Sequence, residues 1–131
     1  MRNRLLGLAI FGALSAAPVM AHHSFSAEYD SKKPVTLKGV VTKFDWANPH
    51  VLFSLDVTDE NGNVNTWTLE MGPPNGLARS GWTRNTMKVG DEVTVEGTLA
   101  KDGSRQANCR SVYFTATGKK LGAASSENTN P

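Results

Sequence analysis

Short segments in which apolar and polar residues alternate, separated by turn residues, constrain the fold of this chain more than any other feature of its sequence. A period of two is typical of half-buried β-strands. Five such segments are found, at residues 35–46, 51–58, 64–71, 93–99 and 112–114. Residues 59–63 predict a hairpin turn, because Asn61-Gly62 accepts positive φ at little cost. Asp102-Gly103 predicts a second hairpin.

The first of these segments is long and irregular. Leu37 and Val41 share one face, whereas Phe44 and Trp46 continue on the opposite parity. A slip of this kind indicates a bulge, and Gly39 suits a sharp bend. The first strand is therefore predicted to be bent.

One short helix is predicted between the third and fourth strands, over residues 77–82 with Asn75 as its N-cap. The order of strand, strand, strand, helix, strand, strand predicts an all-β fold with one short helix. Because the first strand is bent, we expect a small five-stranded OB-type Greek-key barrel. A plain antiparallel meander is the alternative.

The amino end has the pattern of a secretory signal peptide. Arg2 and Arg4 form a positive region, residues 5–14 are apolar, and Ala21 is a small residue that suits cleavage. The apolar run is shorter than the roughly 20 residues that a membrane-spanning helix needs. We therefore expect export to the periplasm, cleavage after Ala21 and no membrane association afterwards.

Four regions follow from these patterns. Residues 1–21 are the signal peptide, and residues 22–34, which carry no sustained period, are an extended lead-in. Residues 35–117 form the barrel. Residues 118–131 lose apolar character, and they are predicted to be a flexible tail.

The charge of the mature chain excludes one class of partner. The full sequence has 14 Lys and Arg against 12 Asp and Glu. Removing Arg2 and Arg4 leaves 14 − 2 = 12 basic residues, which balances the acidic ones. A neutral domain lacks the basic surface of a nucleic-acid binder. Cys109 is the single cysteine, so no internal disulfide forms, and we expect it to be buried.

Several stretches resemble an uncharacterised family of small exported bacterial proteins, a domain of unknown function. The most specific are Ala21-His22-His23-Ser24-Phe25 and the Asn48-Pro49-His50 turn. The others are Glu28-Tyr29-Asp30, Val35-Thr36-Leu37-Lys38-Gly39, Trp46-Ala47, Gly81-Trp82-Thr83 and Gly90-Asp91-Glu92-Val93-Thr94-Val95-Glu96-Gly97. The resemblance implies an OB-like barrel and supplies no established activity. OB-like periplasmic relatives are binding and stress modules, which is analogy at the level of the fold.

The three histidines, His22, His23 and His50, are candidate metal ligands. After cleavage, His22 presents an α-amine and an imidazole that can chelate one ion, an arrangement that resembles the histidine brace of some copper oxygenases and periplasmic copper carriers. A third nitrogen from His50 or His23 completes a planar set that suits Cu(II). The reference pKa of an α-amine is about 7.7–8.0, so its deprotonation near neutral pH costs little.

Two considerations weigh against a folded metal site. Any peptide that begins His-His holds copper weakly, and His50 is also placed to cap the Asn48-Pro49 turn. In addition, the first strand separates its own start from His50 by about 12 residues, or roughly 40 Å if it is straight. The lead-in from His22 to Pro34 is long enough to fold back over that distance, but only if it docks on the barrel.

The remaining candidates are weaker. Trp46, beside the Asn48-Pro49-His50 break, and Asn48 itself are candidate ligand-binding residues on the barrel. No catalytic constellation or phosphate-binding glycine loop is recognisable, so we expect no enzyme. The predicted function is a periplasmic binding or accessory protein, and Cu(II) is the most specific ligand predicted for it. The alternatives are a metal-free protein-interaction adaptor and a barrel that binds an oligosaccharide or small molecule.

Overall fold

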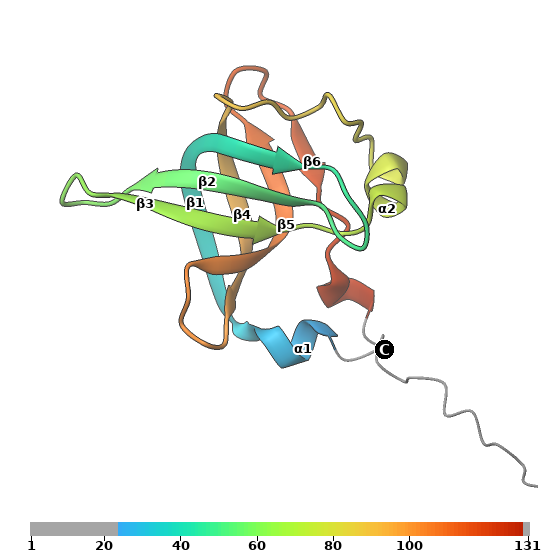
Figure 1. The fold of residues 1–131 in the computed structure, drawn as a ribbon, viewed down its shortest axis with the longest axis horizontal. Coiled ribbons are helices and arrows are strands. Elements are labelled where there is room, and N and C mark those ends of the chain that lie inside the picture. The colour runs from blue at the N-terminus through green and yellow to red at the C-terminus, as the bar shows by residue number, and fades with distance from the viewer. Residues whose placement is uncertain (1–23, 130–131) are drawn as a thin grey trace, which may run out of the picture.

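The computed structural model describes residues 24–129 of the chain. Its elements are α1 (Ser24–Glu28), β1 (Tyr29–Asp45), β2 (Leu52–Thr58), β3 (Val64–Glu70), α2 (Pro74–Arg79), β4 (Glu92–Ala100), β5 (Gln106–Phe114), β6 (Lys120–Gly122) and the 3₁₀ turn η1 (Ser126–Thr129). Figure 1 shows one curved sheet, with α2 and α1 outside it and the β2–β3 hairpin projecting from one side.

The strands form a six-stranded sheet in the order β3-β2-β1-β4-β5-β6. All neighbours in that order are antiparallel, and β3 also pairs with β5 in parallel, which closes the sheet on itself. β1 pairs with β4 through its first part and with β2 through its last part. The predicted all-β, OB-type barrel is confirmed, with β6 as a sixth short strand.

The predicted bulge in β1 is present. The register between β1 and β2 shifts between Val41 and Lys43. Val41 is buried before the shift, and Phe44 packs against the core after it, which accounts for the change of parity. Gly39 serves a related purpose, because a Cβ there would overlap the backbone carbonyl of Asp56 on β2.

The barrel core is closed by α2, which follows β3 and precedes β4 in the sequence. Leu77 of this helix is fully buried. The helix begins at Pro74 and ends at Arg79, rather than covering residues 77–82, and Pro73 occupies the N-cap position instead of Asn75. The fixed φ of proline suits the first turn of a helix, so Pro73-Pro74 sets its start. Cys109 is completely buried, as expected, and so is Val95 of β4.

The extended lead-in predicted at residues 22–34 is wrong at Ser24–Glu28, whereas residues 29–34 are extended but belong to the first strand. Ser24–Glu28 is helical, and β1 begins at Tyr29, where it pairs with Ala100 of β4. Phe25, Tyr29 and Ala100 form a second small apolar cluster. The alternating pattern did not predict the start of β1, because exposed charged residues follow Tyr29.

The flexible tail predicted at residues 118–131 is also wrong over its described part. Lys120–Gly122 pairs with β5, and Leu121 and Ala123 are buried. The indole Nε1 of Trp82 donates a hydrogen bond to the carbonyl oxygen of Gly122 at 2.8 Å. A few apolar side chains among polar ones are enough to dock this segment. Residues 130–131 lie outside the described residues.

Candidate functional site

His50 lies in the loop between β1 and β2, just after a cis peptide bond that joins Asn48 and Pro49. Its Nδ1 is 2.7 Å from Oε1 of Glu70, the last residue of β3. The His50 side chain is 31% exposed and that of Glu70 is 14% exposed, so the contact is partly shielded from water. The ring is therefore held by a carboxylate on a neighbouring strand.

The second carboxylate oxygen of Glu70 is also occupied. The phenol of Tyr29 donates a hydrogen bond to Oε2 of Glu70 at 2.6 Å. The amide Nε2 of Gln106 donates to the same phenol oxygen at 2.8 Å. Burial, followed by the hydrogen bond to the Glu70 carboxylate, raises the pKa of Tyr29 well above its usual range. We call these four residues, His50, Glu70, Tyr29 and Gln106, the seam network.

The name reflects where the network lies. β3 and β5 pair in parallel over only a few residues, with Glu70 opposite Asn108 and Thr68 opposite Gln106. Glu70 and Gln106 thus stand on the two sides of the seam that closes the barrel. Tyr29, from the start of β1, connects them.

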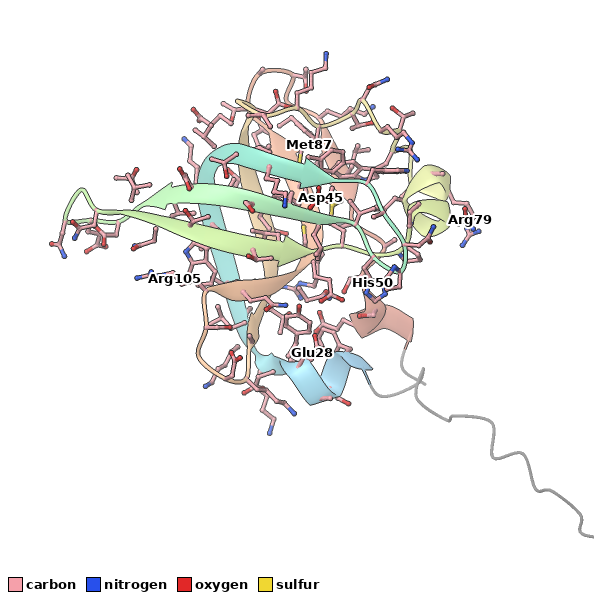
Figure 2. The ribbon with its side chains drawn as sticks, viewed as in Figure 1. Glu28, Asp45, His50, Arg79, Met87 and Arg105 are labelled. Atoms are coloured by element: carbon pink, nitrogen blue, oxygen red, sulfur yellow. The ribbon has the colours of Figure 1, made fainter. Side chains whose placement is uncertain are left out.

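This geometry corrects the separation of roughly 40 Å that a straight first strand would impose. β1 curves around the barrel, so Tyr29 at its start is separated from His50 by a single side chain, that of Glu70. Figure 2 shows His50 and Glu28, the residue before Tyr29, toward the same end of the molecule. His22 and His23 lie outside the described residues, directly before α1.

Metal donors among the described residues are few. Within residues 24–129, no three His, Cys, Asp or Glu side chains are grouped closely enough to hold a metal ion. The seam network offers one imidazole, whose Nδ1 already faces Glu70. The described residues alone therefore do not provide a complete metal-ligand set at His50.

The other predicted ligand-binding residues are less organised. Trp46 is half-buried and packs against the core, with its ring centroid 6.2 Å from that of Phe44. Asn48 is exposed in the loop. Trp46 is thus partly used for packing, and only part of its ring faces solvent.

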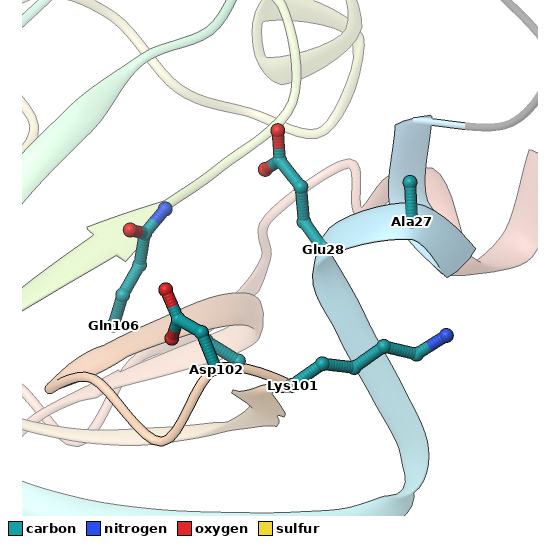
Figure 3. Close-up of a pocket in the computed structure, with 6 residues that line it drawn as sticks. Ala27, Glu28, Lys101, Asp102 and Gln106 are labelled. Carbon is teal, nitrogen blue, oxygen red and sulfur yellow. The ribbon is translucent and has the colours of Figure 1, made fainter.

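A cleft of about 360 Å³ opens beside α1, next to the seam network. Gln106 lines it together with Glu28 and Asp102. In Figure 3 these three side chains point toward a common space, whereas Lys101 is directed away from it. The Lys101 ammonium donates to the carbonyl oxygen of Ser26 instead. Hydrogen bonds from Ser104 lower the pKa of Asp102.

Sequence reasoning did not identify Tyr29, Glu70 or Gln106 as parts of one site. Tyr29 does fall in one of the stretches that carry the family resemblance, Glu28-Tyr29-Asp30, which is the signal that points to it. Glu70 and Gln106 stand at strand ends with no motif around them.

None of the helices within residues 24–129 is long and apolar enough to cross a membrane.

Comparison with known proteins gives a fold and a family. No curated protein matches the chain. Among solved structures, the mitochondrial single-stranded DNA binding protein Rim1 of S. cerevisiae is similar, with 12% sequence identity and a TM-score of 0.50 over 63% of this chain and 93% of that one. At that identity the likeness shows the OB-type fold alone. The model of a family of unknown function, DUF6152, matches residues 12–109. The chain therefore belongs to the DUF6152 family.

Proposed function

We propose that this protein is an exported, non-enzymatic periplasmic module that binds Cu(II) through its mature amino terminus and His50. The observation that carries the proposal is the Tyr29–Glu70–His50 connection, which ties the start of β1 to the only histidine of the barrel. Cleavage after Ala21 makes His22 the first residue, with His23 beside it.

The chemistry of the donors supports this choice. Glu70 engages Nδ1 of His50, which leaves Nε2 as the free donor. A metal-ligating histidine commonly has its other nitrogen hydrogen-bonded to a carboxylate, which orients the ring and raises its basicity. Together with the α-amine and imidazole of His22, or the imidazole of His23, this gives a nitrogen-rich set that favours Cu(II).

The tether between the two parts is short. α1 covers five residues, which is about 7.5 Å at the rise of an α-helix. His22 and His23 precede it directly in the sequence, and two residues span at most roughly 7 Å. The amino terminus therefore needs to span far less than the length of a straight first strand.

The likeness to a single-stranded DNA binding protein does not change the proposed ligand class. The mature chain is neutral by the count of its charged residues. Alternate positions along β2 and β3 that reach solvent include Leu52, Ser54, Asp56 and Thr58 on β2 and Val64, Thr66 and Thr68 on β3, none of which is aromatic or basic. Stacking of bases requires aromatic side chains on such a face, and nucleic-acid binding requires positive charge.

The decisive experiment compares the whole protein with a peptide of residues 22–34, measuring Cu(II) affinity by competition with a chelator. We expect His50→Ala to weaken binding more than tenfold, or about 1.4 kcal/mol. One residue added before His22 also weakens binding, because it displaces the α-amine. Lys43→Ala, an exposed change near the end of β1, is the matched control and leaves affinity unchanged. Copper should also raise the melting temperature.

Two results would overturn the proposal. The first is a peptide that binds Cu(II) as tightly as the folded protein. The second is an exported product whose mass shows that residues 1–21 are retained, since no free α-amine would then exist at His22.

A metal-free adaptor is the second candidate, and the exposed start of β3 favours it. Val64 there is 61% exposed, and residues 64–67 carry no charge. The first half of β1 is a poorer site for an added strand than the start of β3, because it carries Lys32, Lys33 and Pro34, residues that discourage strand addition. Binding of a partner that is abolished by Val64→Lys and unaffected by His50→Ala would favour the adaptor over the metal site.

A further inference from the structure

The orientation of the His50 ring is set by one acceptor. A carboxylate accepts hydrogen bonds and donates none when ionised. With Oε1 of an ionised Glu70 at 2.7 Å, the single proton of a neutral His50 imidazole lies on Nδ1. The lone pair is then on Nε2, on the side of the ring away from Glu70.

Glu70 is itself fixed. Its Oε2 accepts from the phenol of Tyr29, which is only 2% exposed, and that phenol accepts from Gln106. Within the described residues, no buried side-chain nitrogen or oxygen lacks a hydrogen-bond partner. A rotation of the Glu70 carboxylate would leave the Tyr29 phenol without its acceptor in a buried position, which is costly.

The network draws its members from separate elements. Tyr29 belongs to β1, Glu70 to β3 and Gln106 to β5, so their relative positions are set by the strand pairing that closes the barrel. A rigid sheet holds such groups more accurately than a loop does. The loop that contains His50 thus gains its order from the barrel.

We infer that Glu70, held in place by Tyr29 and Gln106, is a positioning residue that fixes the proton of His50 on Nδ1 and presents Nε2 as the metal donor. The inference rests on the proposed function for its metal and on the described geometry for its tautomer. Supporting carboxylates of this kind typically change metal affinity by 10–100-fold.

The test starts with the metal-free protein. Long-range ¹⁵N–¹H correlation spectra distinguish the two tautomers of His50 under mildly alkaline conditions, where a reference imidazole is neutral. We expect the Nδ1–H form in the natural protein and a mixture with the Nε2–H form in Glu70→Ala. Tyr29→Phe should shift the population in the same direction, since it removes the donor that holds Oε2.

Two further variants separate the effect of Glu70 on the tautomer from a general loss of folding. Glu70→Gln keeps the shape and an acceptor oxygen, so it should retain more of the Nδ1–H form than Glu70→Ala does. Tyr113→Phe removes a phenol at a position that is 40% exposed, outside the seam network, and should leave the tautomer unchanged. Thermal unfolding of each variant identifies any that fail to fold, and the comparison then uses the folded ones.

The copper arm uses Cu(II) alone as the probe. Glu70→Ala should lower affinity by at least tenfold and alter the electron paramagnetic resonance spectrum, with a smaller loss in Tyr29→Phe. An Nε2–H tautomer in the natural protein would overturn the inference whatever copper does. If the tautomer is Nδ1–H and depends on Glu70, but Cu(II) binds no better than to residues 22–34, the proposed function fails while the positioning of His50 stands.

Discussion

The phenol of Tyr29 donates to the carboxylate of Glu70 across 2.6 Å, although 41 positions separate the two residues in the sequence. Tyr29 stands at the start of β1 and Glu70 at the end of β3, so the contact joins two strands that are not neighbours in the sheet order. The two residues come together only because the sheet closes into a barrel. A measurement on this hydrogen bond therefore tests whether the barrel is closed.

The first prediction concerns ionisation of Tyr29 at high pH. Burial, and then its bond to the anionic Glu70, raise the pKa of this phenol above the usual value of about 10. In a Tyr113→Phe variant, Tyr29 is the only tyrosine left. Its phenolate absorbance should then appear only when the protein unfolds in alkali.

The same shift fixes the sign of a stability effect. A raised folded-state pKa contributes stability that is complete below the unfolded pKa of about 10 and is lost as pH rises beyond it. Denaturant unfolding at increasing pH should show this loss, and Tyr29→Phe should lessen it. A reversible phenolate signal near pH 10 in protein that is still folded would contradict the prediction.

Much of the barrel could be predicted from the sequence because local rules determine it. Asn61-Gly62 specified the β2–β3 hairpin, and alternation specified the faces of β2 and β4. The parity slip after Val41 located a bulge that the register confirms. The start of β1 and the docking of β6 were missed, because each depends on pairing with a distant strand and only a little on local pattern.

The site was less accessible to such reasoning. His50 was identified as a candidate by residue type, but its partner Glu70 follows from the curvature of β1 and the β3–β5 seam. No local sequence motif predicts the curvature of β1 or the register between β3 and β5. For the same reason, the separation of roughly 40 Å that a straight strand would impose does not apply between Tyr29, at the start of β1, and His50.

The second prediction tests the two faces of β4. Val95 is fully buried, whereas Thr94 is partly exposed. Val95→Ala should destabilise the fold by about 1–3 kcal/mol, through lost contacts and a cavity. Thr94→Ala should change stability by no more than about 0.5 kcal/mol. Chemical denaturation of both variants measures this, and equal losses at the two positions would refute the assignment.

The third prediction concerns Cys109. Its side chain is fully buried, and this burial raises the pKa of the thiol. The thiolate is the reactive form, so both access and ionisation are suppressed in the folded state. We expect a thiol reagent to label the native protein slowly and the denatured protein rapidly, with one thiol per chain. Rapid labelling without denaturant, or a disulfide-linked dimer of folded protein, would show that the β5 interior is open.

The last prediction tests whether the carboxyl-terminal segment is part of the fold. The amide of Gly72 donates to the carbonyl oxygen of Ala123 at 2.8 Å, and the carbonyl oxygen of Gly72 accepts from Val51, the neighbour of His50. A Cβ at Gly72 would overlap the carbonyl oxygen of Ala124 and lie 2.6 Å from its Cβ. Since the obstacle is mainly backbone, the segment must move away to accommodate it.

Gly72→Ala should therefore destabilise the protein by about 1–3 kcal/mol, as overpacking of a close contact does. Gly122→Ala is the matched control in the same region, because a Cβ there meets nothing within 4 Å. Its effect should stay within about 0.5 kcal/mol. Urea unfolding curves for both variants give the comparison, and amide hydrogen exchange at Ala123 shows whether the segment has come loose. If Gly72→Ala is as stable as Gly122→Ala and Ala123 exchanges at the same rate in both, the segment does not pack against Gly72, and the support it gives to the backbone beside His50 is absent.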